Sequence, residues 1–269
     1  AEEAAAFVVD GTSDAKVTFT GTEEEKGWWG GIWIDDTTRS ANRMTHAIFQ
    51  YAGNTEWRDN EPGASLLLYG STQWAGPVTI DITETTFKDS KEYGLFTLGE
   101  VAMESFEDNT FSGNTEGSGI LDPRSVGFLG ESSSFDEPVD VRGGNLGEQE
   151  TTWSDLGVSY RIQGNLEIKG EETKWAVGPG ATVEFREGKG ATIGGSAALV
   201  VDGKPDAKVT FTGTKQEKGW WGGIWLDSTT RSANRITHAV FEFGGDPHWS
   251  DNEPGSNLYL YGNEQWVDP

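Results

Sequence analysis

The chain has 269 residues, of which 44 are acidic and 20 are basic, so its formal net charge is −24 at pH 7. A surface with this charge repels phosphate backbones and anionic membranes, which disfavours binding to nucleic acid or to lipid headgroups. Glycine is abundant (37 residues), methionine is nearly absent (2) and cysteine is absent. Together with many β-branched and aromatic residues, this composition favours strands joined by tight turns, in an all-β protein.

The acidic residues are scattered along the chain and do not form a tail. Two interpretations stay open: solvation at high salt, as in halophilic proteins, and a surface that recruits hydrated cations. No run of about 18 apolar residues is present that could span a bilayer, and the first residues lack the basic and apolar regions of a signal peptide. We therefore expect no membrane insertion of this segment. If the protein is exported, we expect this to be a mature chain or an excised segment.

The first expected strands are short and alternate in polarity. They cover residues 7–11, 16–21 and 31–35, and each closes at a glycine or an aspartate. A period of two over four to six residues indicates half-buried strands. A longer strand over residues 43–53 follows, then a polar loop over residues 54–65 that contains Pro62, and a returning strand over residues 65–70.

The same rhythm continues beyond residue 77, with strands expected over residues 78–82, 86–90 and 93–98. Phe87 and Phe111 are 24 residues apart, and each is followed by polar turn residues. A period of about 20–25 residues with a buried aromatic and a polar turn predicts stacked rungs. Each rung would pair its backbone with the rungs on either side.

The segment from residue 131 to residue 153 is the least regular part of the chain, being rich in serine, glycine and acidic residues. A fresh series of expected strands begins at Trp153 and runs to residue 201. We therefore predict a weak boundary near residue 150. Residues 1–150 would form one module, incomplete on its N-terminal side, and residues 151–269 the start of a second, tandem module, with stacking continuous through the boundary.

One long block of the sequence occurs twice. Residues 6–77 align with residues 198–269 without a gap, and 49 of the 72 positions are identical, including five tryptophans. We call residues 6–77 the first block and residues 198–269 the second block. The sequence thus contains one 192-residue module and the first part of the next. Because Pro269 falls at the phase of Pro77, we expect a segment of a longer tandem array, or a rod that further copies continue.

Four motifs, in a fixed order, carry a family resemblance. They are Trp-x-x-Leu-Gly-Val-x-Tyr-x-Ile-x-Gly (153–164), Val-Gly-Pro-Gly-Ala-Thr-Val-Glu-Phe (177–185), Val-Thr-Phe-Thr-Gly-Thr (209–214) and Gly-x-Trp-x-Gly-Ile (219–224). In this order they resemble bacterial and archaeal surface proteins with right-handed parallel β-helix repeats, of the pectate-lyase-like solenoid superfamily. The resemblance implies a right-handed parallel β-helix in an extracellular or cell-surface protein. Many members have no established activity, so the resemblance supports the fold more strongly than a function.

Tryptophans of the repeated block supply the candidate ligand-binding residues. If Ile32 and Ile34 face the core, alternation places Trp29 and Trp33 together on the outer side, about 13 Å apart at roughly 3.3 Å per residue. Such a flat strip could stack on sugar rings, could contact another protein, or could be covered by a neighbouring loop. The candidate aromatic platform consists of Trp29, Trp33, Trp57, Trp221, Trp225 and Trp249.

A polar loop that recurs in both blocks is the candidate metal site. Its oxygen-bearing side chains are Asp59, Asn60 and Glu61 in the first block and Asp251, Asn252 and Glu253 in the second. Calcium takes six to eight oxygen ligands, so these residues could bind it. The same side chains could instead satisfy backbone groups in a tight turn. We therefore expect that no cofactor is required and keep calcium as the candidate ion.

The sequence gives little support for catalysis. His46 and His238 occupy equivalent positions without a nucleophile or metal partner at a recognisable spacing, so we expect structural roles for both. Arg39, Arg43, Arg231 and Arg235 are the only candidates for the base of a lyase, and we expect them instead to pair with neighbouring acids on the outer face.

We predict an extracellular structural or adhesive β-helix repeat unit without enzymatic activity, whose partners are further tandem modules or copies of itself stacked end to end in rods or fibres. The alternative is a β-helix protein that binds or cleaves carbohydrate, as a polysaccharide lyase or glycoside hydrolase would. Its partner would be a surface glycan, either neutral or bridged by calcium.

Overall fold

The computed structural model describes residues 5–35, 42–56, 61–70, 76–147, 149–229, 233–249 and 255–262. The chain divides into two compact units. Unit 1 contains residues 1–140 and 156–158, and unit 2 contains residues 141–155 and 159–269. The predicted module boundary near residue 150 stays a prediction.

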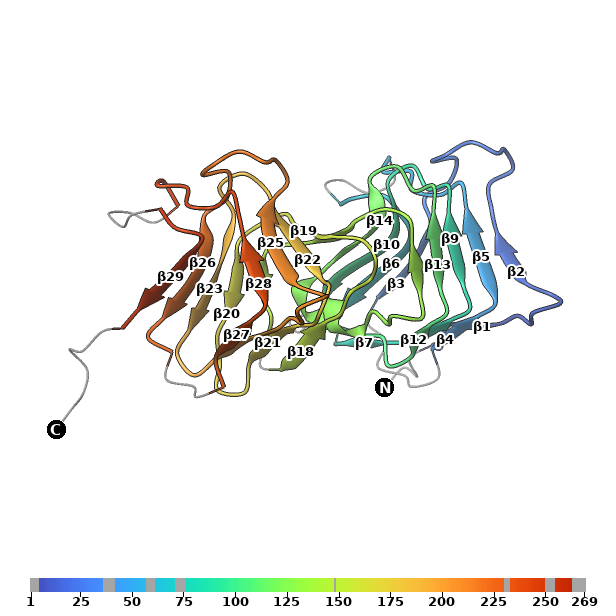
Figure 1. The fold of residues 1–269 in the computed structure, drawn as a ribbon. Coiled ribbons are helices and arrows are strands. Elements are labelled where there is room, and N and C mark those ends of the chain that lie inside the picture. The colour runs from blue at the N-terminus through green and yellow to red at the C-terminus, as the bar shows by residue number, and fades with distance from the viewer. Residues whose placement is uncertain are drawn as a thin grey trace. The chain divides into compact units, whose positions relative to one another are not determined.

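The all-β class predicted from composition is confirmed, because the regular structure of the described residues consists almost entirely of short strands that pair in parallel. One short helical segment occurs among these residues, the 3-10 helix η1 (Pro123–Phe128) in unit 1. Figure 1 shows the strands of each unit lying side by side. This arrangement is compatible with a parallel β-helix.

Unit 1 contains three main sheets. The first has the order β1-β4-β8-β12, formed by Val8–Asp10, Arg43–Thr45, Asp81–Thr83 and Phe106–Glu107. The second has the order β2-β5-β9-β13-β15, formed by Val17–Phe19, Ala47–Gln50, Thr86–Lys88, Thr110–Ser112 and Ser134–Phe135. The third contains β3-β6-β10-β14, formed by Ile32–Asp35, Ala64–Gly70, Tyr93–Gly99 and Gly117–Leu121. A further pair joins β7 (Val78–Thr79) to β11 (Val101–Ala102).

Unit 2 also contains three sheets. One has the order β17-β20-β23-β26-β29, formed by Gly144–Asn145, Leu166–Ile168, Gly190–Gly194, Gly223–Asp227 and Leu258–Tyr261. Another has the order β18-β21-β24-β27, formed by Glu150–Trp153, Lys174–Val177, Ala198–Asp202 and Arg235–Thr237. The last contains β19-β22-β25-β28, formed by Tyr160–Ile162, Thr182–Phe185, Val209–Gly213 and Ala239–Phe241. Strand β16 (Val139–Val141) lies where the chain divides.

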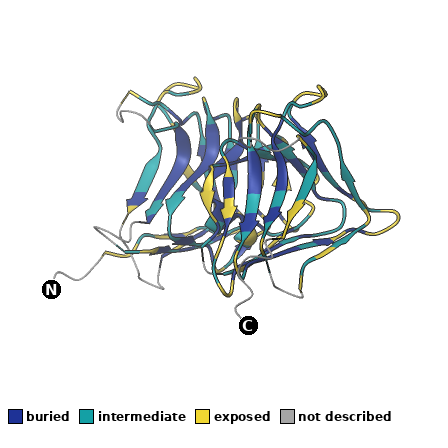
Figure 2. Ribbon diagram, turned by 90° about the vertical axis from the view of Figure 1, so that its left-hand side faces the viewer, coloured by how far each residue is buried: buried dark blue, intermediate teal, exposed yellow. Residues whose placement is uncertain are grey.

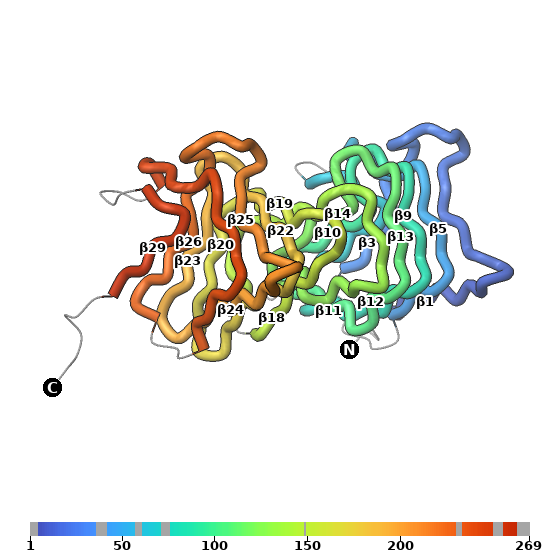
Figure 3. The backbone as a smooth tube through the Cα atoms, in the orientation of Figure 1, coloured from blue at the N-terminus to red at the C-terminus, as the bar shows by residue number. Residues whose placement is uncertain are grey.

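Within each unit the chain visits the three sheets in turn and then returns to the first, as the tube in Figure 3 traces. We call one such passage a rung. The predicted spacing is confirmed at Phe87 and Phe111, which are partners in the parallel ladder of β9 and β13. Other rungs are longer, as between Phe49 and Phe87, which are partners in the ladder of β5 and β9. Loops between the strands absorb the extra residues without disturbing the register.

A column of phenylalanines runs through the core of unit 1. Phe49, Phe87 and Phe111 are at most 1% exposed, and Phe19 and Phe135 extend the column at its ends. Consecutive ring centroids lie 4.7, 5.2, 4.8 and 5.1 Å apart, with interplanar angles of 10–23°. Parallel in-register pairing places equivalent residues of successive rungs above one another, so the side-chain stack follows from the backbone register.

Two buried asparagines of unit 1, one at each end of β13, bond the backbone of the preceding rung. Asn109, 1% exposed, accepts a hydrogen bond from the backbone N–H of Thr85 and donates one to the carbonyl of Ile82. Asn114 does the same with the N–H of Ser90 and the carbonyl of Phe87. These side chains satisfy backbone groups at corners where the sheet ladders are interrupted.

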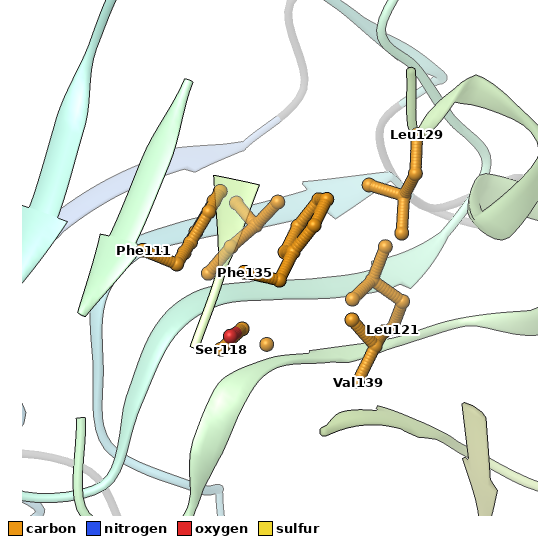
Figure 4. Close-up of a pocket in the computed structure, with 8 residues that line it drawn as sticks. Phe111, Ser118, Leu121, Leu129, Phe135 and Val139 are labelled. Carbon is orange, nitrogen blue, oxygen red and sulfur yellow. The ribbon is translucent and has the colours of Figure 1, made fainter. Parts of the chain in front are cut away.

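The core of unit 1 is closely packed. Figure 4 shows the rings of Phe111 and Phe135 facing each other, with Leu121, Leu129 and Val139 beside them. The small gap that these side chains line leaves no room for a water molecule. Figure 2 shows that the buried residues lie mainly on the strands and that several of the turns are exposed. The apolar interior therefore holds the rungs together by dense contact.

Candidate functional site

The strand that follows Trp28-Trp29-Gly30-Gly31 does not include Trp29, although the predicted outward direction of Trp29 requires the two-residue period to begin there. Gly31 has φ +105°, and Gly223 at the equivalent position has φ +117°. A Cβ atom at Gly31 would lie 2.2 Å from the carbonyl oxygen of Ala64, so only glycine fits. Strand β3 starts one residue later, at Ile32. The two-residue period therefore does not reach back to Trp29 or to its counterpart Trp221.

Trp221 is a core residue, which corrects the expectation that it faces outward. Its side chain is 0% exposed, and its ring stacks on Phe185 at 4.6 Å and 6°. Its indole N–H donates a hydrogen bond to the carbonyl of Glu242 at 2.8 Å. Trp29 makes the equivalent bond to the carbonyl of Gln50 at 2.9 Å and is partly buried. Trp221 thus offers no face for a ligand to stack on.

Trp33 and Trp225 are both partly buried, on strands β3 and β26 respectively. Trp33 packs against an apolar cluster of unit 1 that includes Leu67 and Phe96, and its ring lies 5.7 Å from that of Tyr69. In the first block this tryptophan thus extends a hydrophobic surface that belongs to its own unit.

In unit 2, four aromatic side chains form what we call the outer aromatic cluster: Trp225, Trp249, Tyr259 and Tyr261. The ring of Trp225 makes edge-on contacts with the rings of Trp249 at 6.2 Å, Tyr259 at 5.1 Å and Tyr261 at 6.4 Å. The two tyrosine rings are nearly parallel, 6.4 Å apart and inclined by 16°. Tyr261 is 41% exposed, so the cluster reaches the surface of unit 2.

Trp249 comes from the loop after β28 and folds back over the sheet that contains β26. Cβ atoms built at Gly222 and Gly190 would lie 2.1 and 2.6 Å from its ring, so the absence of side chains there makes room for the indole. Its N–H donates a hydrogen bond to the side-chain oxygen of Asn165 at 3.2 Å. A loop residue therefore covers part of the second-block strand. The equivalent Trp57 lies outside the described residues.

The hollows beside the cluster differ in size. The hollow between Trp225 and Trp249 has a volume of about 10 Å³, enough for about one water molecule and far below the size of a sugar-binding pocket. A larger hollow of about 210 Å³ lies at β29, beside Leu260, Tyr261 and Asn234. A ligand of this face would therefore have to lie across the surface of the cluster, where Tyr261 is exposed and the other three rings are partly buried.

The candidate calcium residues fall almost entirely outside the described residues. Asp59, Asn60, Asp251, Asn252 and Glu253 are not described, whereas Glu61 is described and partly buried. Among the residues with a described position, no three His, Asp or Glu side chains come together in a group that could hold a metal ion. The calcium site stays a prediction.

Arg43 and Arg235 pair with acids, as predicted, whereas Arg39 and Arg231 lie outside the described residues. Arg43 bonds Asp10 through two nitrogens, both at 2.7 Å, and Arg235 lies 3.1 Å from Asp202. The hydrogen bonds from the Arg43 guanidinium hold the pKa of the Asp10 carboxyl below its ordinary value.

The two repeated histidines lie at corners of the rungs. His46 and His238 have φ values of +49° and +44°. The Nε2 atom of His46 lies 2.7 Å from a carboxylate oxygen of Glu84, which has φ +50° one rung further along. Left-handed residues at these corners let the chain turn from one sheet into the next.

Two features were missed from the sequence. The tyrosines of the outer aromatic cluster were not among the candidate residues, although Tyr69 and Tyr261 are identical in the two blocks, a signal that could have pointed to them. Asp140 is fully buried and accepts a hydrogen bond from the hydroxyl of Tyr93 at 2.8 Å. Nothing in the sequence distinguishes this aspartate from its many exposed counterparts.

Comparison with models of protein families, with curated proteins and with solved structures finds no match to this chain. The structure therefore defines its class: an all-β protein of parallel strands, in which two blocks of similar sequence fold alike. In the described part of the chain, no helix has the length and apolar character needed to cross a membrane.

Proposed function

We propose that the chain is a right-handed parallel β-helix that acts as an extracellular or cell-surface structural or adhesive repeat unit and catalyses no reaction. The observation that supports this best is the set of equivalent hydrogen bonds that the two blocks share. Trp28 and Trp220 bond equivalent threonines, at 2.9 and 3.0 Å. Asn42 and Asn234 likewise accept equivalent backbone N–H groups, at 2.9 and 2.8 Å. A sequence that repeats its structural contacts from one block to the next is typical of a scaffold.

The ladders between rungs would give the scaffold its resistance to force. Parallel backbone bonds hold each rung to the next, and stacked rings and buried asparagines add contacts between several of the rungs, so neighbouring rungs separate only when many contacts break together. The net charge of −24 keeps such a surface soluble and away from other anionic polymers. We propose that further tandem modules, or copies stacked end to end, lengthen this scaffold.

Force spectroscopy on the full chain tests the scaffold role. Rungs such as Phe49 to Phe87 and Phe87 to Phe111 would release about 85–135 Å of chain each, at roughly 3.6 Å per residue. We expect unfolding in several such steps, and antibodies to this chain should label intact cells that produce it. Unfolding at negligible force, or labelling only after the cells are opened, would contradict the proposal. Release of reducing or unsaturated sugar ends from a polysaccharide panel would show an enzyme instead.

The outer aromatic cluster favours a second function, which is binding of a neutral glycan. Exposed aromatic faces stack on sugar rings, and a neutral glycan is not repelled by the acidic surface. We expect Trp225→Ala to abolish any glycan-array signal of the wild-type chain. The matched control is Trp28→Ala, because Trp28 is 45% exposed and lies outside the cluster. Equal loss in both variants, or no wild-type signal, would count against this function.

A further inference from the structure

The same residues differ in burial between the two blocks. Leu68 in β6 is 0% exposed, whereas its counterpart Leu260 in β29 is 69% exposed. The difference extends over the rung. Further positions are fully buried in the first block and partly exposed in the second, namely Met44 and Ile236, Ala47 and Ala239, Phe49 and Phe241, and Leu66 and Leu258.

The neighbouring strands explain this difference. In unit 1 the rung of β4, β5 and β6 is followed by β8, β9 and β10, which pair with it along all three sheets. In unit 2 the equivalent rung of β27, β28 and β29 pairs with β24, β25 and β26. On its other side, no described strand continues the three sheets.

The opposite ends of the blocks show the reverse pattern. A difference in sequence between the blocks is therefore excluded as the cause of the difference in burial. Ile224 and Phe211 are fully buried in the second block, where β23 and β22 lie against their strands. Their counterparts Ile32 and Phe19 are partly exposed in the first block. Each block therefore has neighbouring strands at one end that the other block lacks at the equivalent end.

We propose that the edge formed by β27, β28 and β29 is a docking surface for one further rung, of the kind formed by residues 78–99 and joined in phase after the second block. This inference rests on the β-helix architecture proposed above. The hollow of about 210 Å³ beside Leu260 and Tyr261 is the space that such a rung would fill. Burial of Leu260 alone would remove a large apolar side chain from water.

The register of unit 1 specifies the contacts of this rung. Leu66 faces Leu95 and Leu68 faces Thr97, so equivalents of Leu95 and Thr97 would lie over Leu258 and Leu260. By the same rule, an equivalent of Phe87 would stack on Phe241.

Two charge pairs also match. Asp81 faces Arg43 in unit 1, so its equivalent would face Arg235. Lys88 faces Gln50 in unit 1, and the counterpart of Gln50 in the second block is Glu242, so the equivalent of Lys88 would meet an opposite charge. Cross-strand pairs of opposite charge stabilise a sheet.

A separate copy of the chain does not offer this rung. In unit 1, β8, β9 and β10 are paired on both sides, with β4, β5 and β6 on one and β12, β13 and β14 on the other. The free edge of such a copy consists of β1, β2 and β3. Their counterparts in the second block, β24, β25 and β26, pair on that side with β21, β22 and β23, so this edge suits strands of that kind. A rung joined in phase is therefore the occupant that the structure favours.

The test is an extended chain in which a copy of residues 78–140 follows Pro269, so that the sequence continues as it does after Pro77. Hydrogen exchange read by mass spectrometry reports amide protection strand by strand. We expect protection of β27, β28 and β29 to rise at least tenfold. We also expect Leu260→Ala to be silent in the 269-residue chain and to lower protection of these strands at least tenfold in the extended chain.

The matched control is the same extension with aspartates at its equivalents of Phe87 and Leu95, which should give no added protection. An extension that stays unprotected, or one that folds and leaves the three strands unchanged, overturns the proposal. Protection of the unextended chain that rises with its concentration, and is lost in Leu260→Asp, would assign the edge to a second copy and also overturn it. None of these outcomes depends on surface location or adhesion, so failure of this proposal can be distinguished from failure of the proposed function.

Discussion

The phenylalanine column of unit 1 allows the contribution of ring stacking to be measured apart from burial. Phe87 is 0% exposed and stacks on two rings, Phe49 at 5.2 Å and Phe111 at 4.8 Å. Phe87→Leu keeps an apolar side chain in the core but removes both ring contacts. Each contact contributes about 0.5–1.5 kcal/mol beyond buried area, so we expect a loss of about 1–3 kcal/mol. Phe87→Ala should cost more, about 3–5 kcal/mol, because it also leaves a cavity.

Phe241 supplies a matched comparison. It is the second-block counterpart of Phe49 and stacks on one described ring, Phe211 at 4.9 Å. Phe241→Leu should therefore cost about 0.5–1.5 kcal/mol, roughly half the loss in Phe87→Leu.

Hydrogen exchange of the peptides that contain each substitution is the appropriate assay, since two units need not unfold in one transition. The loss at Phe87 corresponds to roughly 5- to 150-fold faster exchange, from about 1.4 kcal/mol per tenfold change. Equal costs for Phe87→Leu and Phe241→Leu, or a cost below about 0.5 kcal/mol for Phe87→Leu, would refute the reasoning that stacked rings hold successive rungs together.

Three further outcomes are expected. Asn109→Ala should destabilise unit 1 by about 2–4 kcal/mol, because the buried N–H of Thr85 and carbonyl of Ile82 each lose a partner; exchange rates unchanged near residue 109 would contradict this. Burial raises the pKa of the Glu137 carboxyl above its ordinary value, so its contribution to stability is fully present below that value and is lost as pH rises through the folded-state pKa. Glu137→Gln should therefore weaken the fall of the denaturant midpoint between pH 4 and pH 8. A pH dependence unchanged from that of the wild type would exclude this carboxyl as its cause. If the recurrent polar loop is a turn and not a calcium site, thermal unfolding should be the same in calcium and in a chelator, and a clear stabilisation by calcium would favour the metal site instead.

The sequence was sufficient to predict the elements that depend on local pattern. Alternation and glycine spacing predicted short strands, and the recurrence of Phe87 at Phe111 predicted the length of one rung, which the ladder register confirms. The single strand expected over residues 43–53 was wrong, because the chain turns at His46, with φ +49°, and forms β4 and β5 in different sheets. The repeat predicted that the two blocks fold alike. This is borne out by the pairing of Arg43 with Asp10 and of Arg235 with Asp202.

The candidate site was less predictable, because side-chain direction near a turn is not a property of period alone. Trp221 was expected outside and lies in the core, since strand β26 begins only at Gly223 and its two-residue period does not reach back to Trp221. Trp249 covers a strand by folding back from a loop, which no spacing in the sequence indicates. Its ring fits there because Gly222 and Gly190 leave the sheet surface open.

Composition, alternation and the 192-residue repeat thus determine the class of fold, the strands and the likeness of the two blocks, because each depends on residues close in sequence or identical between blocks. Burial was decided only by the tertiary structure. Leu68 and Leu260 have the same strand context and nearly the same neighbours in sequence, yet one is 0% and the other 69% exposed. The cause is a strand from another part of the chain, β10, which covers Leu68, while no described strand takes that place over Leu260.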